Sequence, residues 1–524
     1  MISKFITYGR QSGPGWIQAA VTLGGGSLVS SLYLGVIGGY EFLWLQPLAM
    51  LCGIVMLAAI SHVTLSKEDY SDRPFRLIKK SISPALAWGW LIATVVANVV
   101  FCSSQFALAT DTIQTNLGMN MPSFGVTSLL FVVVVGITWL TRIKESWSHM
   151  INKVLKFMVA FIVLSFFIVT VLLIGRSEIM WGELLMGFIP DFTMLFRPVD
   201  SFQTFLSQCG PDEAYWTDYI VSHQRDILIG AFGTAVGINM TFLLPYTLLA
   251  KGWGRAQREL SRFDLLFGLL VPFVLASTCL IIVSASQFHA DPEGVVNLAA
   301  YESILDQKLN ADSGSTALVD IEQLRSLASQ HDKVMSTLLA KRNTFDLSST
   351  LEPLLGSWAI KIFGFGVLAM AISTMLVHMM MNGYAISEAL GNPKNKKYYI
   401  IGALIPAILG LCSPVLWTGS IKTALVIPAS VIATIFLPIA YLTFILLMNK
   451  KSVMGQDIPR NRLLVNVLMI ISTGIAMFAS IWAILGKISD GGSFERLLGG
   501  IGLILFVIML FIGVKSSLSA KHEQ

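Results

Sequence analysis

Apolar residues fall into long segments that are separated by short polar stretches. The segments occupy residues 14–39, 41–66, 84–115, 123–141, 150–174, 227–250, 263–288, 355–390, 398–417, 421–448, 463–486 and 496–514. A helix needs about 20 predominantly apolar residues to cross a bilayer. The pattern therefore predicts an all-α integral membrane protein with twelve transmembrane helices.

The first segment is interrupted in its middle by Gly24, Gly25 and Gly26, which Ser27 follows. Each glycine costs about 1 kcal/mol relative to alanine in a helix interior, so we expect the helix to break here. Non-helical backbone at membrane depth is tolerated only where it is buried in protein or faces a water-filled cavity. Secondary transporters bind their solutes at such breaks. Close packing against a neighbouring helix, which also uses small residues, is the alternative interpretation.

The sixth segment has a similar interruption, since Gly237 and Pro245 bracket residues 239–241. Proline removes a backbone donor and clashes with the preceding turn of a helix. Segments one to five and six to ten thus each begin with an interrupted helix, as in the inverted repeats of transporters. We expect a binding site where the two breaks meet, with helices eleven and twelve at the periphery.

Lysine and arginine concentrate in every second short loop, namely in the loops that are expected on the same side of the membrane as the N-terminus. By the positive-inside rule both termini are expected in the cytoplasm, with the protein in the plasma (inner) membrane. The expected organisation is an N-terminus at 1–13, a first repeat at 14–174, an outer connection at 175–226, a second repeat at 227–448 that includes an outer connection at 289–353, helices eleven and twelve at 449–514, and a tail at 515–524.

Composition excludes several other classes of protein. Only 13% of the residues are charged and 54% are hydrophobic, against about 25% charged in soluble domains. No basic tract interleaved with aromatic residues indicates a nucleic-acid partner. The five cysteines have no metal-ligand spacing, and no paired carboxylates, nucleophile–histidine pair or phosphate loop supports an enzyme or a cofactor. The expected partners are the lipid bilayer and a small solute or cation, and the oligomeric state stays open.

The second outer connection, 289–353, holds ten acidic residues against five basic ones. Such a surface can concentrate cations through its field, but a solvated face is the more common reason for a charge run. The stretch 320–339 has apolar residues at helical spacing, so we expect a small amphipathic cap there.

Several short motifs resemble the Nramp family of divalent-metal transporters, which have a LeuT-type inverted repeat of helices 1–5 and 6–10 with broken helices 1 and 6. The resemblance covers most of residues 14–480 at weak identity. The residues that carry it are Gly13-Pro14-Gly15-Trp16, Gly35 to Tyr40, Leu43-Trp44, Gly182 to Pro190, Leu354 to Gly356, Phe363-Gly364, Ser373-Thr374 and Leu437-Pro438.

The chain departs from the family at the positions that bind metal. The family's helix-one motif Asp-Pro-Gly-Asn is replaced by residues 24–27, and its helix-six motif Met-Pro-His by Met240-Thr241-Phe242. The family's proton-linked aspartate in helix three falls on Gln105, a nearby glutamate on Leu108, and a glutamine of helix ten on Phe436. Transition metals are selected by ligand type and geometry, so the usual Mn²⁺ or Fe²⁺ site is not expected.

The resemblance implies secondary transport by alternating access, with a degenerate metal-ligand set. The expected substrate-binding residues are Gly24, Gly25, Gly26, Ser27, Gln105, Asn239, Met240, Thr241 and Phe242. In this arrangement the glycines supply carbonyls and space, and Phe242 fills the volume of the missing histidine. Three cargo interpretations stay open: a different solute, a largely hydrated divalent cation such as Mg²⁺, or no cargo, in a sensor or binding protein built on a transporter fold.

His378 lies inside the eighth segment and is the candidate for proton coupling. An ionisable residue within a membrane segment is a functional candidate, and histidine titrates in the physiological range. A neutral histidine that bonds a neighbouring helix is the alternative.

Overall fold

The computed structural model is built from helices, with no strand among the residues that it describes. These are residues 2–67, 73–143, 145–175, 180–291, 298–313, 328–340, 359–393, 395–416 and 426–489, with isolated residues at 348 and 356 and between 500 and 515. Eight helices in this part of the chain, or up to ten if each bent pair is one span, are long and apolar enough to cross a membrane. The predicted twelfth helix lies mostly outside the described residues, so the count of twelve stays a prediction.

The first half of the chain follows the predicted segments closely. A short helix, α1 (Ile2–Gln11), precedes the first segment. The spanning elements are α2 (Pro14–Thr22) with α3 (Gly25–Gly38), then α4 (Leu45–Thr64), α6 (Pro84–Thr115), α7 (Ser123–Ile143) and α8 (Glu145–Gly175). A short amphipathic helix, α5 (Pro74–Ser81), connects α4 to α6.

The second half repeats this order. Its elements are α11 (Glu213–Ala235) with α12 (Ile238–Ala250), α13 (Arg258–Leu265) with α14 (Val271–Phe288), α20 (Ala359–Ala389), α21 (Lys396–Leu411) with α22 (Ser413–Leu416), and α23 (Val426–Asn449). One π-helical turn, Leu266–Leu270, separates α13 from α14 immediately before Pro272. The last long helix, α25 (Arg462–Ser489), follows the short helix α24 (Lys451–Met454).

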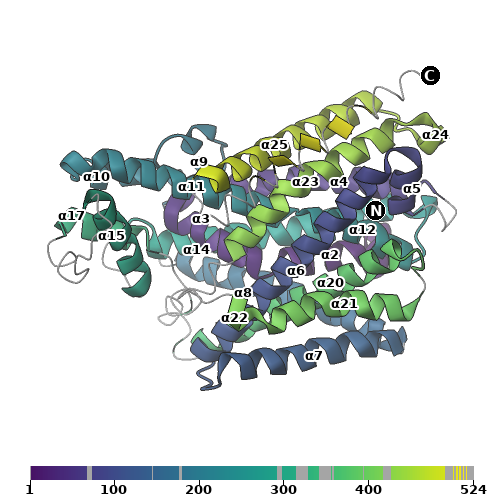
Figure 1. Ribbon diagram of the computed structural model, residues 1–524, viewed down its shortest axis with the longest axis horizontal. Helices are drawn as coiled ribbons and strands as arrows, with labels where there is room; N and C mark the ends of the chain where they lie inside the picture. The colour runs from purple at the N-terminus through teal and green to yellow at the C-terminus, as the bar shows by residue number, and fades with distance from the viewer. Residues whose placement is uncertain are drawn as a thin grey trace.

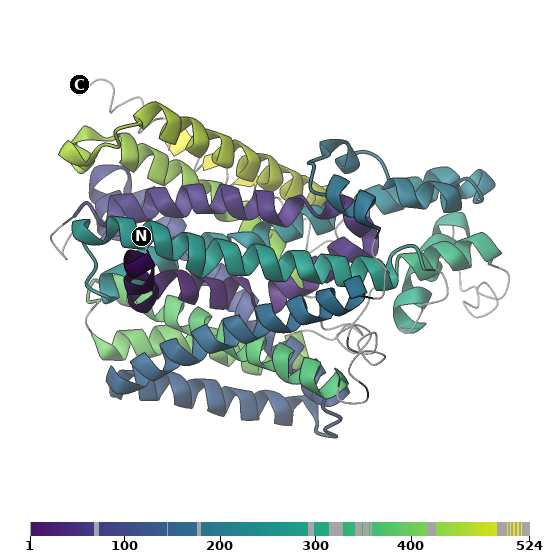
Figure 2. The same ribbon diagram turned by 180° about the vertical axis from the view of Figure 1, so that it is seen from behind.

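The long helices run side by side in a bundle, with the short elements at its two ends (Figure 1). The N-terminal end carries α1, α5 and α24, and the opposite end, here the loop end, carries α9 (Trp181–Met186), α10 (Gln203–Leu206), α15 (Leu298–Ser313) and α17 (Gln330–Leu338), as the reverse view also shows (Figure 2). The described helices of both long connections therefore lie at the end opposite α1.

Both predicted interruptions are present. The axes of α2 and α3 differ by 52° across a break at Leu23–Gly24. In the sixth segment α11 ends at Ala235 and α12 begins at Ile238, so the break lies at Val236–Gly237. Pro245, which the sequence suggested as one edge of this break, lies inside α12. Neighbouring helices compensate for the donor that a proline removes from a membrane helix, which explains why the helix continues through it.

The loop end is a compact cap on α11. This helix begins at Glu213, fourteen residues before the predicted start of its segment, and so extends beyond the bundle. Its Trp216 indole donates to Asp332 of α17 at 2.8 Å, and the Lys308 ammonium of α15 donates to Asp212 at 2.8 Å. The described part of the predicted amphipathic stretch 320–339 is the helix α17; residues 320–327 lie outside the described residues.

The apolar interior contains two large clusters and one small one. Helix one passes from one large cluster to the other between Leu23 and Leu28, so the first break lies at their boundary. The residues that flank the second break, Val236 and Ile238, belong to the same large cluster as Leu23.

Candidate functional site

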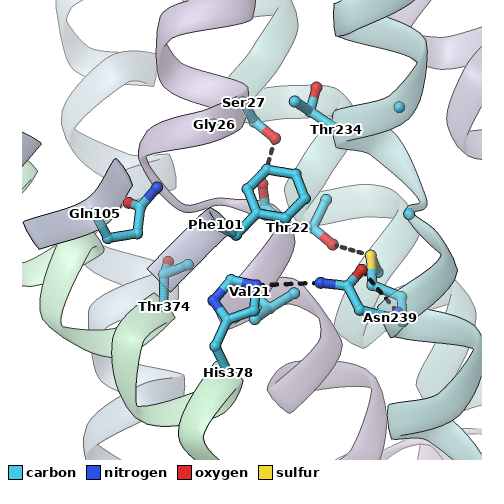
Figure 3. Close-up of a pocket in the computed structure, with 13 residues that line it drawn as sticks. Val21, Thr22, Gly26, Ser27, Phe101, Gln105, Thr234, Asn239, Thr374 and His378 are labelled. Carbon is cyan, nitrogen blue, oxygen red and sulfur yellow. Dashed lines mark hydrogen bonds between the residues drawn. The ribbon is translucent and has the colours of Figure 1, made fainter. Parts of the chain in front are cut away.

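Both breaks open into one cavity inside the bundle (Figure 3). The lining residues come from α2, α3, α6, α11, α12 and α20, so four of the spanning segments contribute to one site. They are Val21, Thr22, Gly26, Ser27, Phe101, Gln105, Gly233, Thr234, Gly237, Asn239, Met240, Thr374 and His378. Of the residues predicted from the sequence, Gly26, Ser27, Gln105, Asn239, Met240 and His378 line this cavity.

Gly24 and Gly25 allow two other helices to approach the first break. A Cβ atom on Gly24 would lie 2.1 Å from the Thr374 hydroxyl oxygen, and one on Gly25 would lie 2.6 Å from Gln105 Oε1. The same Gln105 oxygen accepts a hydrogen bond from the Gly25 backbone N–H at 3.2 Å. It thereby satisfies one of the donors that the start of α3 leaves unpaired.

Met240 connects the two broken helices. The Thr22 hydroxyl donates to its sulfur at 3.0 Å, and the Gln18 amide donates to its backbone carbonyl at 3.2 Å. Ser27, across the first break, donates to the Thr22 carbonyl. The end of α2 and the start of α12 are thus held together by buried hydrogen bonds at the edge of the cavity.

Asn239 and His378 form the polar contact between α12 and α20. The Asn239 side-chain oxygen accepts from the Met240 backbone N–H at 3.0 Å, and its Nδ2 lies 3.1 Å from His378 Nε2. An amide nitrogen is a donor only, so Nε2 is the acceptor and the imidazole is neutral with its proton on Nδ1. Phe101 stacks on this ring, at 5.5 Å between centroids.

Thr241 and Phe242, which were also predicted to bind substrate, face away from the cavity. The Trp90 indole donates to the Thr241 hydroxyl at 2.9 Å, and the Phe242 ring lies 4.7 Å from the Trp90 ring. Consecutive residues of a helix point about 100° apart, so side chains at 239 and 240 that face the cavity turn 241 and 242 toward α6.

The far end of α2 is held by charged side chains. Asp264 of α13, which is 1% exposed, accepts from the backbone N–H groups of Gly13 and Gly15 at 3.0 and 2.6 Å. The Lys156 and Lys251 ammonium groups donate to the Ser12 carbonyl at 2.6 and 3.4 Å. A carboxylate at a helix N-terminus is electrostatically favourable, so the short helix α2 is fixed at both ends.

The chemistry of the cavity is neutral and polar. Its side chains offer hydroxyls, two amides, a thioether and one imidazole, and no carboxylate lines it. Across the described residues, no group of three or more His, Cys, Asp or Glu side chains converges on one point. A bare divalent ion placed here would lack an anionic group to offset its burial, which is heavily penalised.

Several lining residues were not predicted from the sequence, namely Val21, Thr22, Phe101, Gly233, Thr234 and Thr374. Phe101 precedes Gln105 by four residues and Thr374 precedes His378 by four. Residues four apart share a helix face. Gln105 and His378, which were predicted, could therefore have indicated that Phe101 and Thr374 face the same cavity. Thr22 and Thr234 lie directly before the breaks, where the last turn of a helix faces the gap.

The comparisons with known proteins agree with this architecture. The family described as Natural resistance-associated macrophage protein-like (Nramp) matches residues 15–318 and 330–486. The manganese transporter of Eremococcus coleocola, solved with an aromatic bis-isothiourea compound, superposes with a TM-score of 0.61 at 16% identity, over 98% of this chain and 95% of that one. Two mutants of the same transporter superpose with a TM-score of 0.62 at 16% identity, over 98% and 94%. None of the curated protein sequences matches the chain.

The structural likeness identifies the fold as the LeuT type that was expected from the two interrupted helices. The apolar spans make the chain a multi-pass membrane protein. The family match extends over both halves of the chain, including both breaks. The chain therefore belongs to the Nramp family of membrane transporters.

Proposed function

We propose that the protein is a secondary transporter that moves its cargo by alternating access through the cavity between the two breaks. The observation that carries this proposal is the convergence of both breaks on one buried polar cavity. Paired interrupted helices at midplane are the binding arrangement of secondary transporters. Family membership supports a metal cation as the class of cargo.

The lining residues favour a cargo other than a bare transition-metal ion. Gly24 and Ser27 stand where the family places a carboxylate and a carboxamide, and the cavity presents only neutral donors and acceptors. The proposed cargo is a solute whose own charge is already compensated or solvated. A largely hydrated divalent cation such as Mg²⁺ is the second candidate, because hydroxyls and amides such as those of Ser27 and Gln105 can accept hydrogen bonds from metal-bound waters.

An uptake assay with the full chain in proteoliposomes tests the proposal. The probes are Mn²⁺, Mg²⁺ and small anionic and zwitterionic solutes, each with and without a pH gradient. Saturable uptake of at least one probe is expected. Saturable Mn²⁺ uptake that Met240→Ala abolishes, but Met119→Ala at an exposed loop position does not, would show that the argument from missing ligands is wrong.

Binding without uptake would contradict transport and favour a sensor on a transporter fold. Isothermal titration of the same probes against the detergent-solubilised protein measures this directly. A saturable isotherm in a protein that moves none of the probes is the result that replaces the transport proposal.

A further inference from the structure

The contact between His378 and Asn239 joins a titratable side chain to a helix break. His378 is 2% exposed and Asn239 is 3% exposed. The other lining residues come from α2, α3, α6, α11, α12 and α20, and none of them is acidic or basic. Among the described residues, His378 is therefore the one acidic or basic side chain that lines this cavity.

We propose that His378 binds the coupling proton at Nε2, and that Asn239 converts its arrival into a rearrangement at the start of α12. This inference rests on the proposed transport function. It adds the coupling ion, the atom that binds it and the residue that responds.

The hydrogen bonds at Asn239 exclude a proton on Nε2 in the present arrangement. The lone pair of Nε2 accepts from Asn239 Nδ2 at 3.1 Å. A solution proton that bonds to this lone pair makes the imidazole a cation with donors on both nitrogens, which leaves two donors facing each other. The amide must then turn so that Oδ1 accepts from the new N–H.

Turning the amide removes Oδ1 from the Met240 backbone N–H. That N–H keeps a single acceptor, the Gly237 carbonyl at 3.1 Å. Met240 is also the residue whose sulfur and carbonyl bind Thr22 and Gln18 of α2. Protonation of His378 on α20 thus changes the contacts of Asn239 and Met240 on α12, and through Met240 it affects α2 of helix one.

Gly237 leaves room for the Asn239 amide in its present orientation. A Cβ atom on this residue would lie 2.7 Å from Asn239 Oδ1 and 3.4 Å from the Ala433 Cβ atom. The glycine therefore leaves the space that the Asn239 oxygen occupies, which is a role beyond interrupting the helix.

The closed cavity disfavours the imidazolium, since no lining residue carries a compensating charge. A buried cation without a partner is strongly penalised. Proton binding therefore favours the conformation in which water reaches His378, and this preference is the coupling between the proton and the conformational change.

A measurement without cargo tests this linkage in the full chain. Hydrogen exchange of the peptide covering 238–246 is followed from about pH 8 to about pH 4, as protection factors that remove the intrinsic pH dependence. Protection of the wild type should fall about tenfold on acidification, the effect of one lost hydrogen bond. In His378→Gln it should stay constant, because glutamine accepts from Asn239 without binding a proton, while the exposed control His331→Gln should match the wild type.

The Asn239→Asp variant distinguishes proton binding at His378 from a purely structural role, because only proton binding would shift the titration of His378. A carboxylate accepts from the imidazolium and from Met240 N–H together, so the ¹⁵N-histidine titration of His378 should move to higher pH while residues 238–246 stay protected. A pH response in His378→Gln equal to the wild type, or an unshifted titration in Asn239→Asp, overturns the proposal. If the protein takes up a probe but the hydrogen exchange of 238–246 does not change with pH, only the proton coupling is wrong. If the hydrogen exchange changes with pH but no probe is taken up, the transport function is wrong and the link between His378 and α12 stands.

Discussion

The two breaks that form the cavity are stabilised in different ways. At the first break, side chains from other helices approach the backbone through space that glycines leave open, and Gln105 satisfies the Gly25 N–H from α6. At the second break, Asn239 bonds the backbone of its own neighbour, and His378 holds that amide in place. The first break depends on steric room, whereas the second contains a hydrogen bond to a titratable side chain, His378.

This difference separates a fixed element from a responsive one. A glycine contact cannot change with pH or with bound cargo, whereas an imidazole changes from acceptor to donor. We therefore expect substitutions at the first break to lower stability at every pH. Substitutions at the second break should change how the protein responds to pH.

Gly15→Ala, at the end of α2 opposite the first break, should have the largest effect on the first broken helix. The added Cβ would lie 2.1 Å from the Asp264 backbone oxygen, which cannot move like a flexible side chain. Overpacking of this kind costs about 3 kcal/mol and would also displace α2 from the Asp264 carboxylate. The measurement is the melting temperature in detergent, together with uptake in proteoliposomes.

The matched control is Gly9→Ala in α1, where a Cβ atom would meet nothing within 4 Å. Equal melting temperatures for the two variants would show that α2 is not held sterically against α13.

Gly24→Ala should be the next most disruptive change, at about 2 kcal/mol. Its Cβ would lie 2.1 Å from the Thr374 hydroxyl oxygen and 3.0 Å from the Val21 carbonyl oxygen. Thr374→Ala removes the closer of these atoms, so the double variant should recover most of the lost stability. The coupling is read from a double-mutant cycle on melting temperature, and additive losses would contradict a direct contact.

Gln105→Leu should cost about 1 kcal/mol, the usual effect of losing a side-chain acceptor at a helix start. The Gly25 N–H loses its partner at 3.2 Å while the volume near Leu108 is kept. Gln105→Glu retains an acceptor oxygen and is the control. If the leucine and glutamate variants have the same melting temperature, another group accepts the hydrogen bond from the Gly25 N–H.

The smallest expected effect concerns His289, which follows α14 at the loop end. Burial lowers the pKa of this histidine, and its hydrogen bond to the Val36 carbonyl of α3 partly offsets the shift. The unfolded chain therefore binds the proton more readily, so stability is full above the ordinary histidine pKa of about 6.5 and declines as the pH falls below it.

His289→Gln should reduce this acid sensitivity, as measured by melting temperature at about pH 8 and pH 5. The exposed His331→Gln is the control. A His289→Gln variant that loses as much stability on acidification as the wild type would exclude His289 as a source of pH dependence at the first broken helix.

Much of the fold followed from the sequence because membrane helices must be apolar over a fixed length. The segment 84–115 begins at a proline and forms α6 with the same bounds. The triple glycine predicted the first break within one residue. The sixth segment was predicted to end at residue 250, as α12 does, but its start and one edge of its break were wrong. Its polar start at Glu213 packs on the cap and lacks an apolar signal, and Pro245 lies inside α12, where neighbouring helices compensate for the missing donor.

The cavity was only partly predictable. Residues 26, 27, 105, 239, 240 and 378 were identified, because glycine runs and polar residues are unusual in apolar segments and Met240 lies beside one of them. The contacts of Asp264 with Gly13 and Gly15 span about 250 residues and leave no local pattern. The directions of Thr241 and Phe242 depend on the helical phase after the break, which a sequence pattern does not fix.

The long helix α11 reaches from the cap to the cavity as one rigid rod. Its 23 residues give a length of about 34 Å, so a tilt of 5° about the break would displace its far end by about 3 Å. Trp216 and Asp212 attach that far end to α17 and α15. A small rotation of α11 at the cavity would therefore move the cap by several ångströms. We expect an antibody fragment that binds the cap rigidly to hinder rearrangement at the cavity.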